Sequence, residues 1–330
     1  MSGRVSGRVA SAAFLLLLVA LPWISPSYRF LSIAISTGTV AITLYGLAVL
    51  FGQAGLMSVG HAALMGVGAY SAAILALRLG IGFWGALPCA MLTAALAAGL
   101  IGLPSLRVSG HHFVIITYAF CTLLTIVLTN GGDATGGASG LDLDPVGRLF
   151  GVNFDSVRNY YLLVLAALLA AMLATDLIAR SGYGRTLRAI RENEALARAV
   201  GINTALHKLG AFMLSGAFAG LAGVLQAYYL RHISPGLYGG LPSLYIAMSV
   251  MLGGARVLYG PLAGAVIVNF LPEVLSIDPV DSRMAYGAGL VLVILLLPGG
   301  VIASLADLGA WAAALARRTA GRWTQLAQGR

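Results

Sequence analysis

The sequence contains a series of long apolar runs, and this feature restricts its possible folds more than any other. The runs lie at about 10–24, 30–51, 62–77, 83–103, 112–129, 159–179, 208–230, 242–255, 261–276 and 284–304. A helix needs about 20 predominantly apolar residues to cross a bilayer, and several of these runs are shorter. With 59% apolar and only 9% charged residues, the sequence predicts an all-α polytopic membrane protein with about ten transmembrane helices, within a range of roughly eight to ten.

The distribution of basic residues predicts the orientation of these helices. Arg4 and Arg8 precede the first run, and no clean small-x-small cleavage site follows it, so we interpret this run as an uncleaved first span. With a cytoplasmic N-terminus, the outer side receives only six of the 20 Lys and Arg residues, namely Arg29, Arg78, Arg148, Arg158, Arg231 and Arg283. Because cytoplasmic loops collect the larger share of cations, both termini are predicted to be cytoplasmic. The net charge of +9 is then a topological signal, and no nucleic-acid partner is expected.

The spans and charges divide the chain into consecutive segments. These are a cytoplasmic N-terminus (1–9), a first group of spans (10–129), an outer loop (130–158), a span (159–179), a cytoplasmic loop (180–207), a last group of spans (208–304) and a basic cytoplasmic tail (305–330). The outer loop carries four aspartates around a glycine-rich stretch at 135–141, namely Asp133, Asp142, Asp144 and Asp155. Their oxygens are too irregularly spaced for a calcium loop. The loop is either a docking or closing surface or a plain solvated connection.

The segment 181–203 is the one long polar stretch in the chain. Its charged residues are Arg185, Arg188, Arg191, Glu192, Glu194 and Arg198, and its apolar residues Leu187, Ile190, Ala197 and Val200 recur at helical spacing. Glu194 and Arg198 form an i,i+4 pair in the favoured orientation, and Gly201 is typical of a helix stop. The pattern predicts one short amphipathic helix outside the bilayer, which either contacts a partner or lies on lipid headgroups.

The stretch 50–70 has too many glycines and polar side chains for a simple lipid-facing helix. An interrupted helix at bilayer depth is tolerated only where protein or a water-filled cavity covers its polar groups. Gln53, Ser58 and His61 therefore either line a substrate path or form interhelical hydrogen bonds. The same two alternatives apply to Thr117, Tyr118 and Thr122, which we place along one face of the helix at 112–129.

The common catalytic and metal-binding signatures are absent from the sequence. There is no phosphate-binding G-x-x-x-x-G-K-S/T loop, no H-E-x-x-H, no C-x-x-C and no G-x-S-x-G. No catalytic residue and no metal site is predicted, and Cys89 and Cys121 are interpreted as packing residues. An ion-coupled carrier is the alternative transport class, but Asp176 and Glu273, the only carboxylates near spans, both lie close to span ends.

Six motifs in order make the chain resemble a known family from about residue 30 to 300. They are F-G-Q-A-G-L-M-S-V-G-H-A-A-L at 51–64, L-R-V-S-G-H-H-F at 106–113 with T-Y-A-F at 117–120, T-G-G-A-S-G-L at 135–141, G-R-T-L-R-A-I-R-E-N-E-A-L-A-R-A-V-G-I at 184–202, F-A-G-L-A-G-V-L-Q-A at 218–227 and L-G-G-A-R-V-L-Y-G-P-L-A-G-A at 252–265. The chain thus resembles the LivM-type permease subunits of branched-chain amino acid ABC importers.

The resemblance implies a function, partners and a location. It implies a multi-pass permease of the bacterial inner membrane whose helix at 184–202 couples to an ATPase through Gly184, Arg188, Arg191, Glu192, Glu194, Arg198 and Gly201. The implied partners are a homologous second permease, two cytoplasmic ATPases that bind ATP and Mg, and a periplasmic solute-binding protein, which would make 130–158 a periplasmic loop. The permease itself would carry no cofactor. Leucine, isoleucine and valine are the expected solutes, with urea, short amides or other amino acids as the alternative.

Overall fold

The computed structural model describes residues 22–23, 27–106, 111–149, 152–274 and 288. Within these residues, seven helical segments are long and apolar enough to cross a membrane. They comprise α2 (Tyr28–Leu47) with its continuation η1 (Ala48–Gln53), α3 (His61–Leu79), α4 (Phe83–Ser105), α5 (His111–Thr129), α6 (Val157–Arg180), α9 (Thr204–Leu230) and α10 (Gly240–Gly253) with the preceding turn η4 (Pro235–Tyr238). Shorter helices α11 (Gly260–Ala265), η5 (Val266–Phe270) and α12 (Leu271–Val274) follow.

The predicted fold class is confirmed. Eight of the ten predicted apolar runs correspond to these helices, and the runs at 10–24 and 284–304 lie outside the described residues except for 22–23 and 288. The structure therefore agrees with an all-α polytopic membrane protein.

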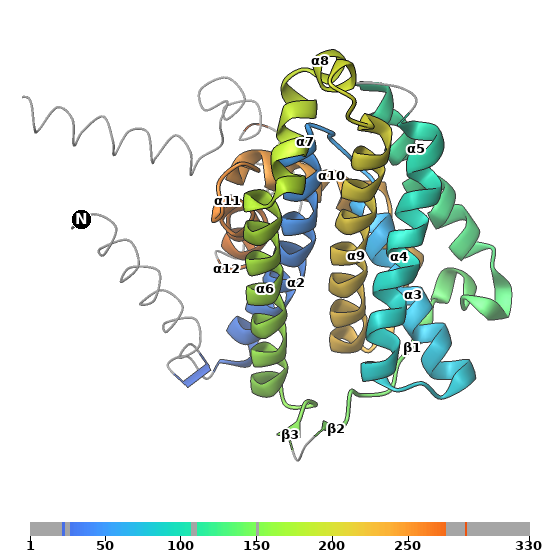
Figure 1. Ribbon diagram of the computed structural model, residues 1–330. Helices are drawn as coiled ribbons and strands as arrows, with labels where there is room; N and C mark the ends of the chain where they lie inside the picture. Colours follow the sequence, from blue (N-terminus) through green and yellow to red (C-terminus); the bar gives the residue numbers. More distant parts are fainter. Residues whose placement is uncertain (1–21, 24–26, 107–110, 150–151, 275–287, 289–330) are drawn as a thin grey trace, which may run out of the picture.

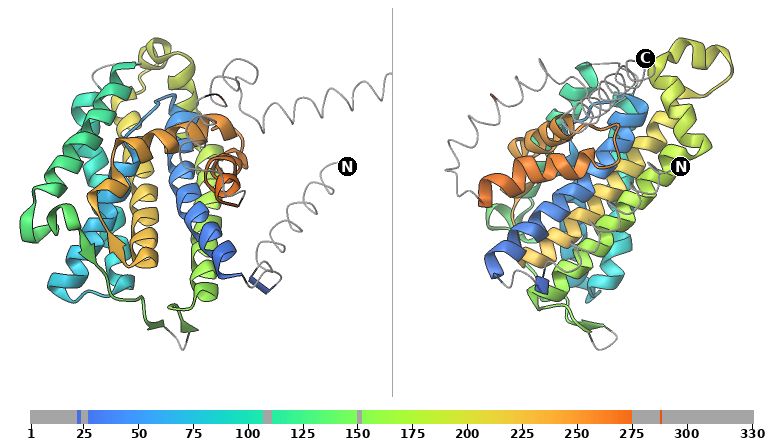
Figure 2. Two further views of the ribbon diagram at one scale, coloured as in Figure 1. Left: turned by 180° about the vertical axis from the view of Figure 1, so that it is seen from behind. Right: turned by 90° about the vertical axis from the view of Figure 1, so that its left-hand side faces the viewer.

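Helices α2 and α9 occupy the centre of the bundle. In Figure 2 they lie between α10–α12 on one side and α6 on the other. The most apolar stretch of α2 with η1 is 78% buried, whereas that of α5 is only 22% buried. Leucines project from α4 without cover, including Leu92, Leu96 and Leu100. Since an apolar surface at this depth faces lipid or another apolar protein, α4 and α5 belong to the periphery.

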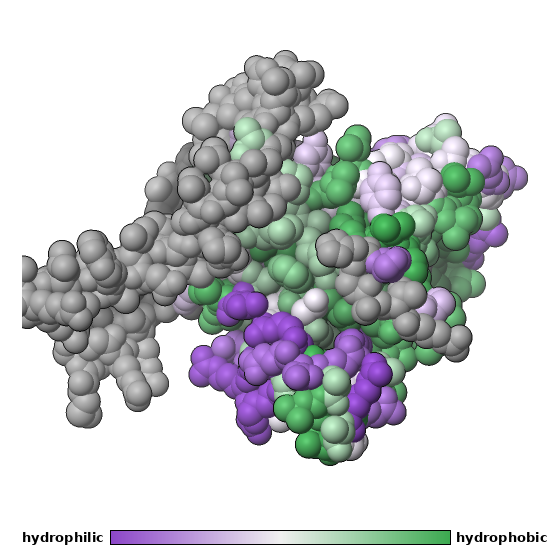
Figure 3. All heavy atoms as spheres, turned by 90° about the horizontal axis from the view of Figure 1, so that it is seen from above, coloured by the Kyte–Doolittle hydropathy of each residue, from purple (hydrophilic) through white to green (hydrophobic). Residues whose placement is uncertain are grey.

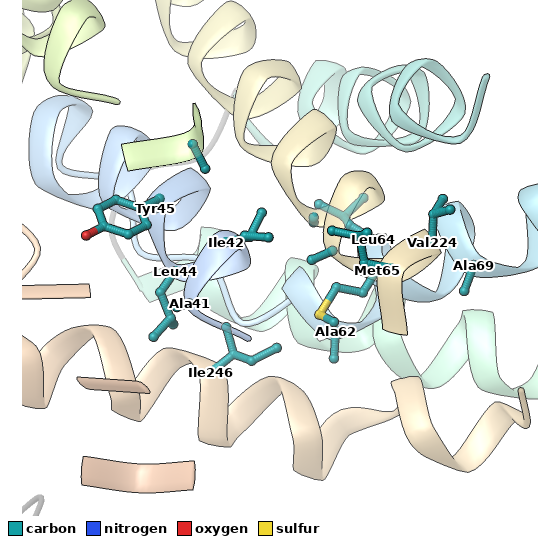
Figure 4. Close-up of a cluster of buried hydrophobic side chains, with 14 of the residues drawn as sticks. Ala41, Ile42, Leu44, Tyr45, Ala62, Leu64, Met65, Ala69, Val224 and Ile246 are labelled. Carbon is teal, nitrogen blue, oxygen red and sulfur yellow. The ribbon is translucent and has the colours of Figure 1, made fainter. Parts of the chain in front are cut away.

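The core is built where small and branched side chains of four helices meet. Ile42 and Leu44 of α2, Leu64 of α3, Val224 of α9 and Ile246 of α10 gather in one buried cluster (Figure 4). Helix α9 also crosses α4 closely, with Gly216 and Gly220 of α9 against Ala90, Ala94 and Ala98 of α4. A Cβ atom on Gly220 would stand 2.7 Å from the Ala90 carbonyl oxygen of α4, so this crossing requires glycine.

The two polar ends of the bundle carry different structures. The connection from α5 to α6 contains the turns η2 (Gly132–Ala134) and η3 (Gly137–Ser139) and the strands β1 (Leu141–Asp142), β2 (Arg148–Leu149) and β3 (Val152–Asn153). Strand β1 pairs antiparallel with β4 (His232–Ile233), and β2 pairs with β3. Helices α7 (Gly182–Glu192) and α8 (Glu194–Ala199) lie at the opposite end from β2 and β3 (Figure 1).

Candidate functional site

The polar segment 181–203 forms two helices, not the single helix that we predicted. Helix α7 ends at Glu192, and Asn193 adopts an extended backbone with φ −154° and ψ 99°. Its side chain then accepts a hydrogen bond of 3.0 Å from the Leu196 amide and so caps α8. Asparagine competes with helical hydrogen bonds and favours such caps, and this competition explains the break inside a helical pattern.

The end of α8 matches the predicted helix stop. Gly201 has φ +88°, and its amide donates to the Arg198 carbonyl at 2.9 Å, while the Ile202 amide donates to the Ala197 carbonyl at 3.0 Å. These two bonds form the C-terminal motif that needs a left-handed residue, a conformation that glycine adopts without a steric penalty. The chain then turns back into α9, which begins at Thr204.

The α7–α8 segment has an inner and an outer face. Leu187, Ile190 and Ala197 point inward and are buried, whereas Val200, which follows the same helical spacing in the sequence, is 69% exposed. Leu196, one turn earlier, is 62% exposed. Figure 3 views this end of the molecule and shows hydrophilic residues around hydrophobic ones over the segment. Exposed leucine and valine among charges suit either of the two predicted contacts, with a partner protein or with lipid headgroups.

A four-residue ionic cluster joins α8 to the start of α9. The Glu194 carboxylate accepts hydrogen bonds from Arg198 at 2.6 Å, Lys208 at 2.6 Å and Thr204 at 3.0 Å. Burial opposes ionisation of Glu194, but the hydrogen bonds from Lys208, Arg198 and Thr204 outweigh it and lower its pKa to about 2. The Glu194–Arg198 pair is the predicted one. Lys208 and Thr204 lie 14 and 10 residues further along the chain and give no local sequence signal.

A hollow lies beside the ionic cluster. It has a volume of about 690 Å³ and is lined by the end of α4 and the start of α9, including Leu103, Leu106, Arg198, Thr204 and Leu206. Its walls combine apolar side chains with the Arg198 guanidinium. The segment therefore offers both a projecting apolar surface and an adjacent recess at the same end of the molecule.

Two arginines on the inner face of α7 bind the interrupted segment. Arg188 donates to Gln53 Oε1 at 2.7 Å and to the Ala179 carbonyl of α6 at 2.7 Å. Arg191 donates to the Gly52 carbonyl. Burial, and next the nearby charge of Arg256, lower the pKa of Arg191. Both arginines therefore connect α7 to the transmembrane helices and remain partly exposed.

The predicted interruption is confirmed at 55–60. The widened turn η1 ends at Gln53, the chain from Gly55 to Gly60 is irregular, and α3 begins at His61 inside the bundle. Side chains replace the missing helical acceptors, because buried backbone amides need partners. The Val59 amide donates to Thr117 Oγ1 at 3.1 Å and the Ala62 amide donates to Ser243 Oγ at 3.1 Å.

The side chains predicted to line a path lie at this interruption. His61 Nε2 lies 2.6 Å from Ser215 Oγ of α9, and Ser58 Oγ accepts a hydrogen bond from the Gly60 amide at 3.2 Å. Ser58, His61 and Thr117 have no exposed surface, and Gln53 is 9% exposed. The buried contacts agree with the hydrogen-bonding alternative in this conformation, while the path-lining role stays a prediction.

Helix α5 differs from the prediction in one respect. Thr117, Tyr118 and Thr122 do not share a face, because Thr117 is fully buried whereas Tyr118 and Thr122 are exposed. Cys121 is buried as expected, but it also donates to the Val59 carbonyl at 3.2 Å. Thr117 and Cys121 are four residues apart and therefore lie on one face of a helix, which is the face that contacts the interruption.

Two serines of the site could not be predicted from the sequence. Ser215 and Ser243 sit in apolar helices whose local sequence gives no sign that they face residues 59–62.

Among the described residues, no group of three or more His, Cys, Asp or Glu side chains is placed to hold a metal ion. Asp176 pairs with Arg180 at 2.9 Å near the exposed end of α6.

Comparisons with known proteins agree with the resemblance. The family model described as branched-chain amino acid transport system / permease component matches residues 29–306. The high-affinity branched-chain amino acid transport system permease protein LivM of Escherichia coli strain K12 is 30% identical over an alignment of 321 residues that covers 90% of this chain and 75% of that protein.

Other relatives are named for the import of different solutes. The ribose import permease protein RbsC of Haemophilus influenzae is 25% identical over 287 residues, 82% of this chain and 85% of its own. The autoinducer 2 import system permease protein LsrC of Salmonella typhi is 32% identical over 143 residues, 42% of this chain and 40% of its own. No solved structure matches the chain. The family match spans most of the sequence, and the chain therefore belongs to the branched-chain amino acid transport system permease family.

Proposed function

We propose that this chain is the membrane permease subunit of an ATP-driven importer and that α7–α8 is its contact with a separate ATPase. The observation that carries the proposal is the two-sided construction of this segment. Leu196 and Val200 are exposed and Arg198 between them in sequence lines the hollow, while Arg188 and Arg191 hold the inner side to the transmembrane bundle. A segment that only rested on lipid headgroups would need no such attachment to the interior of the bundle.

The proposed assembly contains further subunits. We infer a homologous second permease that completes the translocation path, two cytoplasmic ATPases that bind ATP and Mg, and a periplasmic solute-binding protein. The exposed apolar faces of α4 and α5 suit a partner permease or lipid. The chain would lie in the bacterial inner membrane with both termini in the cytoplasm, and Gln53, Ser58, His61, Thr117 and Tyr118 are the proposed lining residues in an open state.

Branched-chain amino acids are the proposed solutes. Two LivM proteins, each 30% identical to this chain, are named for branched-chain amino acid transport. Relatives named for ribose and autoinducer 2 import indicate that this permease architecture serves several solutes, so urea, short amides or other amino acids remain the second choice. An ion-coupled carrier has less support, because Asp176 is paired with Arg180 near a helix end.

The test is affinity purification from gently solubilised membranes of the wild-type chain and of two variants, Leu196→Glu and Val200→Glu. We expect the wild type to retain a second permease and ATPases, with ATP hydrolysis stimulated by one branched-chain amino acid and its binding protein. Each variant should lose the ATPases, since a carboxylate replaces an apolar contact. Val152→Glu, an exposed apolar residue in β3 at the opposite end of the bundle, is the matched control and should retain them.

Two results would contradict the proposal. If the wild-type chain returned alone and moved solute with an ion gradient, it would be an ion-coupled carrier. If the two α8 variants kept normal amounts of ATPase, the contact would lie elsewhere.

A further inference from the structure

The segment 52–60 contains the last residues of η1 and the interruption, and its first residues are fastened to α7. Arg191 donates to the Gly52 carbonyl and Arg188 donates to the Gln53 side chain. Gly55 has φ +74°, and a Cβ atom there would stand 2.5 Å from Cγ of Arg191. The arginine side chain therefore lies directly across the backbone of this segment. These contacts involve residues more than 130 positions apart, so they do not follow from chain connectivity.

The other end of the segment is fastened inside the bundle by three different helices. Thr117 of α5, Ser215 of α9 and Ser243 of α10 hold Val59, His61 and Ala62 respectively. Each of these three helices thus makes a polar contact to residues 59–62, where α3 begins. A shift of that turn must break or move contacts to all three helices at once.

Between its two ends the segment is short and irregular. Gly55 to Gly60 form no helical turn, and six residues of extended chain span at most about 20 Å. A short connection fastened at both ends transmits displacement, whereas a long flexible loop would absorb it. Arg188 also bonds the Ala179 carbonyl of α6, so α7 is joined both to α6 and to the end of η1, from which the irregular chain leads to α3.

We infer that Arg188 and Arg191 are positioning residues that carry movement of α7 through segment 52–60 to the first turn of α3. This inference rests on the proposed function, in which an ATPase moves α7–α8. The two arginines would then determine how much solute is moved for each ATP hydrolysed, and would contribute little to the assembly of the complex. Leu196 and Val200 would instead contribute to the assembly of the complex and have little influence on the amount of solute moved for each ATP.

The test uses the assembled complex in proteoliposomes and compares Arg188→Gln, Arg191→Gln and Arg185→Gln. We expect the first two variants to copurify with the ATPases and to hydrolyse ATP, while solute moved per ATP falls about tenfold or more, because a charge-assisted hydrogen bond is lost. Arg185 lies on the same helix, is exposed and, among the residues that the structure describes, donates only to the Arg180 carbonyl. Arg185→Gln therefore removes the same charge and should keep the wild-type ratio. The conservative variant Arg191→Lys should restore part of the ratio.

A second measurement uses only the wild-type complex and therefore does not depend on the folding of a variant. Hydrogen exchange of residues 54–64 in the wild-type complex should change by several-fold when a non-hydrolysed ATP analogue binds, because the segment moves with α7. An unchanged exchange rate, or variants that assemble and keep the wild-type ratio, would overturn the inference and leave the proposed function standing. A wild-type complex without ATPases would instead overturn the proposed function.

Discussion

Glu194 binds Lys208, Arg198 and Thr204 at the same time, and this makes the start of α9 sensitive to acid. Its pKa is lowered from 4.5 to about 2 by these partners. A carboxyl whose pKa is lower in the folded state contributes stability above its unfolded pKa and loses it as the pH falls through the folded value. The contribution of Glu194 is therefore complete above about pH 4.5 and declines between about pH 4.5 and 2.

This predicts how the melting temperature of the detergent-solubilised protein depends on pH. Glu194→Gln should lower the melting temperature at pH 7, and its melting temperature should fall less than that of the wild type between pH 5 and pH 3. Glu192→Gln, an exposed change in the same segment outside the cluster, serves as the control and should follow the wild type. Equal pH dependence in wild type and Glu194→Gln would contradict the role of the cluster.

At the residue scale, the sequence predicts local contacts and misses distant ones. Glu194 and Arg198 are recognised because an i,i+4 pair meets on any helix. The contact between His61 and Ser215 has no such local rule, since it depends on how α3 packs against α9. The polar residues of 50–70 could be selected from their unusual setting, but their partners could not.

Helix α9 shows at the scale of an element how glycine permits a close crossing. A Cβ atom on Gly220 would stand 2.7 Å from the Ala90 carbonyl oxygen and 2.7 Å from Ala94 Cβ. Gly220→Val should destabilise the protein by at least about 2 kcal/mol, because α4 and α9 must move apart. The measurement is thermal unfolding in detergent, together with the amount inserted in the membrane.

Gly236→Ala is the matched control for this substitution. Within the described part of the chain, and apart from its two neighbours in sequence, no heavy atom lies within 4 Å of a Cβ atom placed on Gly236, so this variant should behave as the wild type. If Gly220→Val unfolded at the wild-type temperature, the tight crossing would be absent in the folded protein.

Elements were predictable where composition alone defines them. Apolar runs of span length gave the transmembrane helices, and the glycine-rich stretch gave the interruption, because both depend on local sequence. The break at Asn193 was missed because the flanking residues keep a helical period. The hydrogen bond from the Leu196 amide to the Asn193 side chain competes with a continuous helix. Only the packed structure shows which of the two conformations forms.

At the scale of the whole molecule, the distribution of charge predicts which end is cytoplasmic. The α7–α8 end collects seven of the described cations, namely Arg180, Arg185, Arg188, Arg191, Arg198, Lys208 and Arg256. In a background with Cys89→Ala and Cys121→Ser, Arg185→Cys should react with a membrane-impermeant thiol reagent only after the membrane is opened. Asp144→Cys, in the connection from α5 to α6, should react in intact cells, and the reverse pattern would contradict the orientation.

The break at Asn193 separates two sets of contacts along one short stretch of chain. Arg188 and Arg191 of α7 face the bundle, whereas Leu196 of α8 and the adjacent Val200 face outward. Under the proposed function, substitutions in α8 would change which ATPase binds, while Arg188 and Arg191 of α7 would keep the internal connection. If the proposed contact holds, this division would let a permease change its ATPase partner during evolution, or share one ATPase with other permeases, while its transmembrane core stayed the same.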